Sequence, residues 1–196
     1  MYVSKNGDII GNIVIKDEIK KGSKDTILSL NKLGIKTRMF TGDKKEVAEN
    51  IGKSLGILEI KSEMLPENKY KELEDILKKY NGTNSKVAFV GDGINDSPVL
   101  ALSDIGMSMG GIGTDAAIEA SDVVIMTDEI GKILEAIKIS KKTNFIIKQN
   151  LIFAIGTKWL ILILSILGLA GMWQAIFADV GVTLMTILNT LRILKR

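Results

Sequence analysis

The fold of this chain is decided by the segment KVAFVGDGINDSP, which runs from Lys86 to Pro98. Its first half, residues 86–90, is a short apolar run of the kind found in strands buried on both faces. The second half places two carboxylates, Asp92 and Asp96, beside two glycines, which allow tight turning and close backbone approach after the strand. This order predicts a site at the carboxyl end of a strand.

The segments around this motif alternate between short apolar runs and amphipathic helices. We expect helices over residues 22–33, 44–55, 66–80 and 129–142. We expect strands over residues 9–15, 36–40, 57–60, 86–90, 105–109 and 123–126. Strands that alternate with helices predict βαβ units, so the fold class is α/β with a parallel sheet.

A second loop, Thr41-Gly42-Asp43, falls at another predicted strand end. Thr41 offers a hydroxyl and Gly42 a backbone N–H, and a helix N-terminus follows, so this loop is a candidate phosphate cradle. The alternative is that Thr41 or Asp43 only caps that helix. Lys69, three residues after Pro66, is a candidate to balance phosphate charge, although a single lysine on a helix is more often simply solvated.

The residue types restrict the chemistry. The chain has no histidine and no cysteine, which excludes imidazole and thiolate ligands, His-based triads and disulfides. Asp92 and Asp96 are hard oxygen ligands of the kind that Mg²⁺ uses together with substrate phosphates. The alternative is a solvated polar loop, in which Asn95 and the aspartates only form turns.

The composition changes near residue 144. Residues 1–143 carry 21 cations and 22 acids, whereas residues 144–196 carry five cations and one acid. Residues 159–178 are a charge-free run of 20, and about 20 helical residues cross a bilayer core. We expect two membrane helices, over residues 144–167 and 172–194. The alternatives are one span plus a soluble helix, or a buried pair of core helices.

The charges around these helices predict their orientation. Cations flank the outer ends of the two helices, and the turn at Gly168–Gly171 has none, so both ends are expected in the cytoplasm. Because the basic excess surrounds apolar segments, no nucleic-acid-binding surface is expected. The polar first residues give no sign of a signal peptide.

Two ionisable residues, Lys158 and Asp179, fall inside the predicted membrane helices. Each lies roughly 12–15 Å from the turn, near the middle of the bilayer. Intramembrane charges are costly and are functional by default, and equal depth permits a Lys–Asp pair. The alternative is a purely structural ion pair.

In combination, these motifs resemble the phosphorylation domain of P-type cation-transporting ATPases, members of the haloacid-dehalogenase superfamily. Residues 41–43, 66–69 and 91–98 match that family in order and spacing, and the helical hairpin resembles the last two membrane helices of its heavy-metal subfamily. The resemblance implies a haloacid-dehalogenase-like parallel sheet with flanking helices. It also implies three parts: residues 1–15 as the end of a nucleotide-binding domain, 16–143 as the phosphorylation domain and 144–196 as the hairpin.

The resemblance also implies a role for each site residue. Thr41 and Gly42, in the loop that ends at Asp43, would bind the transferred phosphoryl group, and Lys69 would neutralise its charge. Asp92 would ligate Mg²⁺, and Asn95 and Asp96 would complete the phosphate and Mg²⁺ network. The intact pump would use ATP.

The segment Ala178–Gly181 resembles the zinc, cadmium and lead branch of the family. Asp179 would then be a ligand of the transported Zn²⁺ or Cd²⁺, with Lys158 as its electrostatic partner. The implied protein is a multi-pass pump of the plasma membrane that contacts the lipid bilayer and has its soluble domain in the cytoplasm.

The family's nucleophile motif, Asp-Lys-Thr-Gly-Thr, does not occur in this chain. We therefore expect the chain alone to be inactive and to need the N-terminal portion of the pump. One alternative is a membrane-anchored haloacid-dehalogenase-like phosphatase, which would need its own Asp-x-Asp motif, and none occurs. Another is a non-catalytic fragment that complements a separate N-terminal half.

Overall fold

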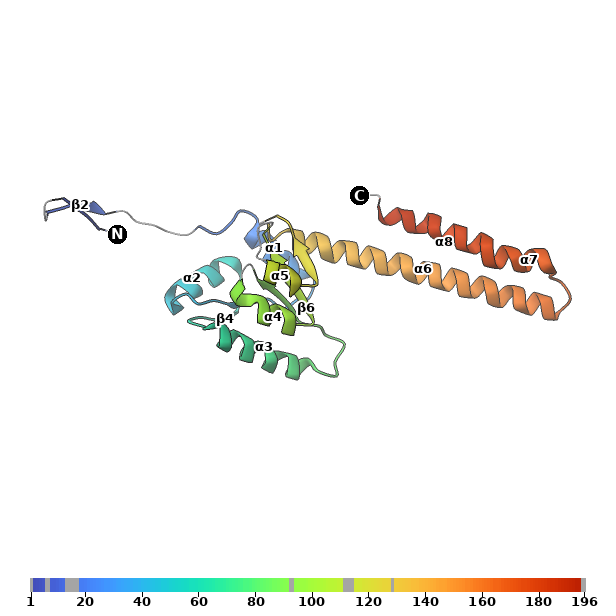
Figure 1. The fold of residues 1–196 in the computed structure, drawn as a ribbon, viewed down its shortest axis with the longest axis horizontal. Coiled ribbons are helices and arrows are strands. Elements are labelled where there is room, and N and C mark those ends of the chain that lie inside the picture. The colour runs from blue at the N-terminus through green and yellow to red at the C-terminus, as the bar shows by residue number, and fades with distance from the viewer. Residues whose placement is uncertain are drawn as a thin grey trace. The chain divides into compact units, whose positions relative to one another are not determined.

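The computed structural model describes residues 2–5, 8–12, 18–91, 94–110, 115–127 and 129–194. The chain divides into two compact units, residues 1–132 and 133–196. The first unit carries all the described strands, and the second is made of helices (Figure 1).

Strands and helices alternate in the first unit, which confirms the α/β prediction. Its strands are β1 (Tyr2–Lys5), β2 (Asp8–Asn12), β3 (Arg38–Phe40), β4 (Glu59–Lys61), β5 (Ala88–Gly91), β6 (Ile105–Met109) and β7 (Val123–Ile125). Its helices are α1 (Ser23–Lys32), α2 (Lys45–Leu55), α3 (Pro66–Tyr80), the 3₁₀ turn η1 (Ile94–Asp96), α4 (Ser97–Leu102) and α5 (Asp115–Glu119).

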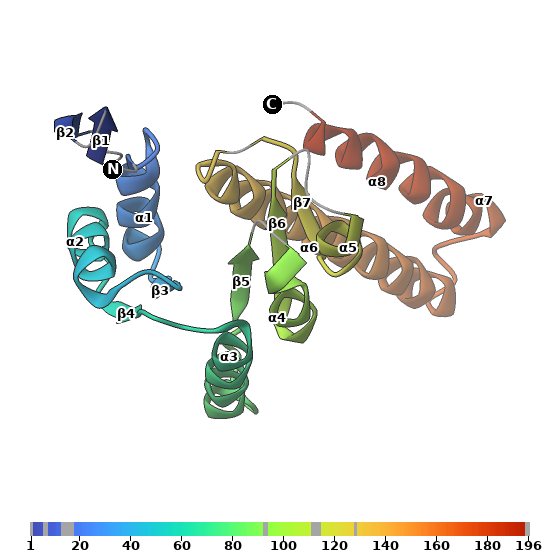
Figure 2. The ribbon, with the colours of Figure 1, turned by 60° about the vertical axis from the view of Figure 1, so that its left-hand side comes forward.

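The strands after residue 18 pair in parallel, as predicted, but in two separate sheets. β3 pairs with β4, and β6 lies between β5 and β7, the three strands side by side in Figure 2. Within the described residues, no ladder joins β3 to β5. Phe40 at the end of β3 nevertheless contacts Phe89 of β5, with ring centroids 6.4 Å apart. The two sheets therefore approach each other through side chains, and among the described residues β3 and β5 each have one unpaired edge.

Helix α3 has the bounds that the sequence predicts. Pro66 occupies its first turn, where a missing N–H costs nothing, and Leu73 and Ile76 on its apolar face are 2% and 8% exposed. Leu73 and Leu100 of α4 belong to the core of this unit, and Leu100 is 1% exposed. This packing places the beginning of α3 close to the loop that follows β5.

The N-terminal strands differ from the prediction. The expected strand over 9–15 is found as β2, which ends at Asn12 and pairs antiparallel with β1, and residues 13–17 lie outside the described residues. The residues between β1 and β2 are Asn6 and Gly7, a strong hairpin signal that the sequence analysis overlooked.

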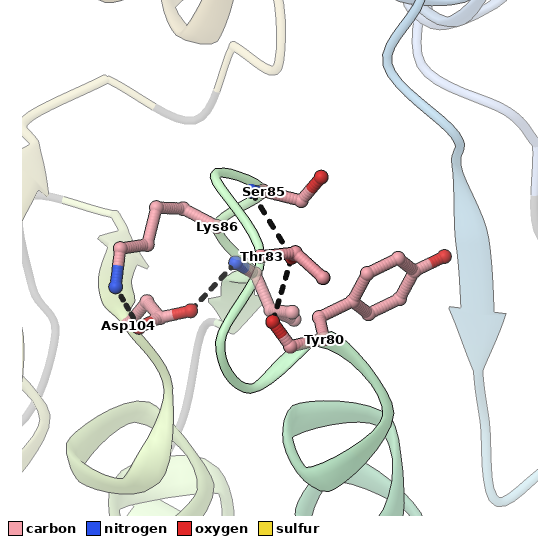
Figure 3. Close-up of polar contacts among 6 residues, drawn as sticks. Tyr80, Thr83, Ser85, Lys86 and Asp104 are labelled. Carbon is pink, nitrogen blue, oxygen red and sulfur yellow. Dashed lines mark hydrogen bonds and ion pairs between the residues drawn. The ribbon is translucent and has the colours of Figure 1, made fainter.

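The start of β5 is fixed by a network of polar contacts (Figure 3). Thr83 Oγ1 donates to the carbonyl of Tyr80 at 2.6 Å and accepts from the backbone N–H of Ser85 at 3.2 Å. Asp104 accepts from Lys86 Nζ and from the backbone N–H of Val87, both at 2.9 Å. Because Asp104 directly precedes β6, these bonds join the beginnings of β5 and β6 and support their pairing register.

The second unit contains α6 (Lys132–Ile166), α7 (Met172–Ile176), a π-helical turn (Phe177–Gly181), α8 (Val182–Thr190) and a final 3₁₀ turn (Leu191–Ile193). The prediction of separate helices over 129–142 and 144–167 is wrong, because α6 is continuous. Residues 132–155 contain neither glycine nor proline, so nothing in the sequence interrupts the helix. At 35 residues, α6 exceeds the length needed to cross a bilayer core of about 30 Å.

The two helical arms form a hairpin, and they run side by side in Figures 1 and 2. The turn contains Gly168, whose φ of +72° is the left-handed conformation that glycine tolerates. Both arms, Lys132–Ile166 and Met172–Ile193, are long and apolar enough to cross a membrane. Their apolar surface is largely exposed in this chain, with Trp159 at 61% and Leu188 at 65%. This exposure is typical of a membrane hairpin and unlike a pair of core helices.

Candidate functional site

The loop Thr41–Asp43 directly follows β3 and is closed by its own hydrogen bonds. Thr41 Oγ1 donates to Asp43 Oδ2 at 2.8 Å and accepts from the backbone N–H of Asp43 at 3.1 Å. Helix α2 begins after Lys44, and no side chain caps it. The capping alternative for Thr41 and Asp43 is therefore wrong. Their oxygens instead lie in a turn at the carboxyl end of a parallel strand.

This loop is joined to the segment before α3. The backbone N–H of Glu63 donates to the carbonyl of Asp43 at 2.9 Å, and that of Met64 donates to the carbonyl of Thr41 at 3.0 Å. Glu63 has a φ of +55°, the left-handed region that non-glycine residues rarely adopt. The turn at Glu63 thus brings the beginning of α3, which carries Lys69, toward the Thr41 loop.

Lys69 and Asp96 meet between α3 and the loop after β5. Lys69 Nζ lies 2.9 Å from Asp96 Oδ1, and the two side chains are only 18% and 13% exposed. A pair this sheltered from water interacts more strongly than a surface salt bridge. The structure thus brings together two predicted site residues that lie 27 positions apart in the sequence.

Gly91 permits this arrangement because it leaves space for Asp96. A Cβ at Gly91 would lie 2.9 Å from Asp96 Cβ and 3.1 Å from its Oδ2, closer than atoms can comfortably approach. Tight turning and close backbone approach are the two roles predicted for the glycines of this motif. At Gly91 the structure agrees with close approach.

The remaining residues of the motif are placed as follows. Asp92 and Gly93 lie outside the described residues, so the role of Asp92 stays a prediction. Asn95 is exposed and lines a cavity of about 350 Å³ together with Pro66, Tyr70 and Pro98. Ser97 Oγ is buried and has no hydrogen-bond partner within the described part of the chain.

Mg²⁺ is the cofactor that the resemblance implies, and the oxygen ligands near the carboxyl end of β5 fit it. Within the described residues, no three acidic side chains gather into a metal cage. Mg²⁺ does not need one, because it commonly takes one or two carboxylates and completes its shell with water and phosphate oxygens. Asp96 supplies a carboxylate. The Ser97 hydroxyl beside it, which has no hydrogen-bond partner among the described residues, can bond to a water or ligand oxygen.

The charge environment is perturbed at the other end of β5. The pKa of Asp104 is lowered, first because the backbone N–H of Val87 donates to its carboxylate, and then because Lys86 donates to it and attracts it. Asp104 is far from the Asp96 end of the strand and anchors the sheet. Its perturbed pKa therefore indicates a structural contact and not a catalytic one.

The hairpin carries the second candidate site. Lys158 Nζ on α6 lies 3.2 Å from Asp179 Oδ1 in the π-helical turn, so the two residues form the pair that their equal depth permits. Thr183 Oγ1 donates to the backbone carbonyl of Asp179 at 2.6 Å. The side chains of Lys158 and Asp179 remain 60% and 75% exposed on the hairpin, which leaves both accessible to a ligand.

A polar clamp, missed by the sequence analysis, joins the two arms of the hairpin. Asn150 Nδ2 on α6 donates to Thr190 Oγ1 at 2.9 Å and to the Thr186 carbonyl at 3.2 Å, while its Oδ1 accepts from Asn189 Nδ2 at 2.8 Å. Asn150 precedes Lys158 by eight residues, about two helical turns, so both lie on one face of α6. The clamp thereby supports the register in which Lys158 meets Asp179.

Comparison with known proteins agrees with this geometry. Residues 2–104 match the haloacid dehalogenase-like hydrolase family, so the chain belongs to that family. Across all 196 residues it is 48% identical to the cadmium, zinc and cobalt-transporting ATPase of Bacillus subtilis (strain 168). It is 46% identical to the zinc-transporting ATPase of Synechocystis sp. (strain ATCC 27184 / PCC 6803 / Kazusa). These matches confirm the resemblance that the motifs indicate.

The structural match extends through the hairpin. A crystal structure of a zinc-transporting PIB-type ATPase in the E2·Pi state matches 98% of this chain, with a TM-score of 0.85 and 35% identity. The chain covers 31% of that structure and 28% and 27% of the two ATPases above. It therefore spans little more than a quarter of the length of these relatives and corresponds to their C-terminal part.

Proposed function

We propose that this chain is the C-terminal part of an ATP-driven pump that exports divalent zinc, cadmium or lead. The observation that carries the proposal is the Lys158–Asp179 ion pair on two membrane-length helices. The same chain holds the sheltered Lys69–Asp96 pair at the sheet edge. The chain thus combines a candidate phosphate-binding site with a charged site in the membrane helices. This combination supports a pump that couples phosphoryl transfer to cation movement.

The residues gathered at the carboxyl ends of β3 and β5 would perform the phosphoryl chemistry. The Thr41 hydroxyl and the Gly42 backbone N–H would bind the phosphoryl oxygens, and Asp43, hydrogen-bonded to Thr41, would orient that hydroxyl. Lys69 would balance the phosphate charge. Asp92, Asn95 and Asp96 would hold Mg²⁺ and the phosphate network, and Mg²⁺ would supply charge neutralisation at the phosphate. Positioning and charge neutralisation are the main contributions in such reactions.

The hairpin would contribute to the membrane metal site. Asp179 offers an anionic oxygen that Zn²⁺ and Cd²⁺ accept as a ligand. When no metal is bound, Lys158 at 3.2 Å offsets the charge of Asp179, which would be costly alone in a bilayer. On release, the ammonium group would compete with the metal for the carboxylate.

The first unit also supports dependence on an N-terminal portion. Among the described residues, β3 and β5 each pair with a strand on one side only, although an unpaired edge strand is a liability that native proteins usually protect. Val90 of the apolar strand β5 is 37% exposed. The N-terminal portion of the pump would supply the nucleophilic aspartate, and an added strand between β3 and β5 would satisfy both edges.

Two other functions have less support. A membrane-anchored phosphatase needs its own nucleophile, and no Asp-x-Asp motif occurs in this sequence. A non-catalytic fragment that complements a separate N-terminal half would have the same contacts as those described above, so the contacts do not separate it from the pump. Whether the open reading frame continues upstream of this chain distinguishes such a fragment from a pump that is encoded as one polypeptide.

The proposed location is the plasma membrane, with the first unit and both ends of the chain in the cytoplasm. The support is the cationic flank at the outer ends of the hairpin and the uncharged turn around Gly168. The two membrane-length helices agree with a multi-pass protein.

The function is tested by Asp179→Ala in the full-length pump. We expect metal-stimulated ATPase activity and metal binding to be lost together, because the carboxylate ligand is gone. Lys158→Ala should retain binding and slow turnover. Met185→Leu, a volume-conserving change on the same arm, is the control and should change neither. Phosphorylation by inorganic phosphate should persist in all three variants. Wild-type transport of Zn²⁺ and Cd²⁺ by Asp179→Ala would refute the proposed site.

A further inference from the structure

Asp179 lies in a π-helical turn within the second arm of the hairpin. Residues Phe177–Gly181 form this turn between α7 and α8, and the backbone N–H of Val182 donates to the carbonyl of Phe177, five residues earlier. The wider turn gives up the regular i→i+4 pattern. Single π-turns within α-helices occur frequently at functional sites.

The turn is accompanied by a close contact between an aromatic ring and a glycine. A Cβ placed on Gly181 would lie 2.7 Å from Cδ2, 2.9 Å from Cε2 and 3.4 Å from Cγ of Phe177. Carbon atoms in favourable contact are about 3.5–4.0 Å apart. The Phe177 ring therefore covers the Gly181 backbone, and there is no space for a methyl group.

Glycine is needed at position 181 because the Phe177 ring leaves no room for a side chain, and not because of the backbone conformation. Its φ of −64° and ψ of −44° are ordinary helical values that every L-residue adopts. Alanine at this position would therefore favour the helix in every respect except its collision with Phe177. The residue type is explained by the ring that lies over it.

We propose that Gly181 is a positioning residue for Asp179, acting through its contact with Phe177; the inference rests on the proposed role of Asp179 in metal binding. Phe177 begins the turn, and its carbonyl accepts the bond that closes it. A side chain at Gly181 displaces Phe177 and reshapes the turn. Each residue of an α-helix turns by about 100°, so a change of winding redirects Asp179 away from Lys158.

The hairpin provides a matched control. Gly156 on α6 also lies in a membrane helix, and a Cβ there would meet no atom of the described residues within 4 Å. Gly156→Ala and Gly181→Ala thus make the same chemical change and differ in the space available. Any effect of adding a methyl group to a membrane helix in general would appear in both variants.

The experiment uses the full-length pump, purified in detergent. We measure the Zn²⁺ concentration for half-maximal ATPase activity, the maximal rate, and phosphorylation by inorganic phosphate without metal. For Gly181→Ala we expect at least a tenfold rise in the half-maximal Zn²⁺ concentration with unchanged phosphorylation by inorganic phosphate. Gly156→Ala should stay within twofold of wild type. Phe177→Ala/Gly181→Ala, which removes the collision, should recover most of the lost metal affinity.

The outcomes separate this inference from the proposed function. If Asp179→Ala abolishes metal binding but Gly181→Ala behaves like Gly156→Ala, the positioning role is refuted and the metal site stands. Failure of the double variant to recover affinity also refutes it. If Gly181→Ala does not insert, the double variant decides: insertion with near-wild-type affinity supports the inference, and failure to insert or bind overturns it. Normal transport by Asp179→Ala refutes the proposed function itself.

Discussion

The Lys69–Asp96 contact permits a quantitative prediction about the phosphate site. Lys69→Met removes the ammonium group and keeps much of the side-chain volume, and Asp96→Asn removes the carboxylate charge. If the two residues act as one unit, the double variant should be less impaired than the product of the two single effects. This non-additivity measures the coupling between the side chains.

The magnitude follows from the distance and the exposure. At 2.9 Å, two unit charges attract each other by about 6 kcal/mol at an effective dielectric constant of about 20, before desolvation is subtracted. Exposed pairs retain about 0–1 kcal/mol, and breaking a buried pair costs about 3–5 kcal/mol. With side chains 18% and 13% exposed, we expect a coupling of about 2 kcal/mol. This corresponds to roughly a 30-fold departure from additivity.

The assay is the inorganic phosphate concentration for half-maximal phosphorylation of the full-length pump in Mg²⁺, measured for wild type, both single variants and the double variant. Lys71→Met is the control, because Lys71 is an exposed lysine two residues away on the same helix. It should leave the value within about twofold of wild type, as expected for a solvated surface charge. Additive effects of Lys69→Met and Asp96→Asn would show that the pair does not act as a unit and would refute the reasoning.

Three further predictions concern the first unit. This chain alone, incubated with Mg²⁺ and γ-labelled ATP, should form no aspartyl-phosphate, and acid-stable, hydroxylamine-sensitive label on it would contradict this. Asp92→Asn in the full-length pump should abolish phosphoenzyme formation while circular dichroism stays unchanged, and normal turnover would mean that the loop is only a turn. The lowered pKa of Asp104 means that its stabilising contribution is present above the ordinary aspartate pKa of about 3.9 and is lost as the pH falls through the lower folded value. Unfolding midpoints of wild type and Asp104→Asn should therefore converge in acid, and a constant difference between them would contradict the assignment.

The sequence by itself determined the features that depend on local patterns. Pro66 and the apolar period of α3 set that helix, and the strand-ending loops at residues 41–43 and 91–98 followed from apolar runs that stop at glycine and aspartate. The charge-free run determined the hairpin, because only its length and composition matter for crossing a bilayer. These signals were readable because each depends on residues close together in the chain.

Only the tertiary structure decided which distant residues meet. Lys69 reaches Asp96 because the turn at Glu63 directs α3 toward the loop after β5 and because Gly91 leaves space there. The Asn150 clamp joins residues about 40 positions apart, which no local pattern predicts. The π-turn at Asp179 was equally hidden, because Gly181 has an ordinary helical backbone and its necessity comes from the Phe177 ring above it. The periodicity of apolar residues predicts which face of a helix or strand is buried. The room available at that face and the residues that contact it depend on how the elements pack.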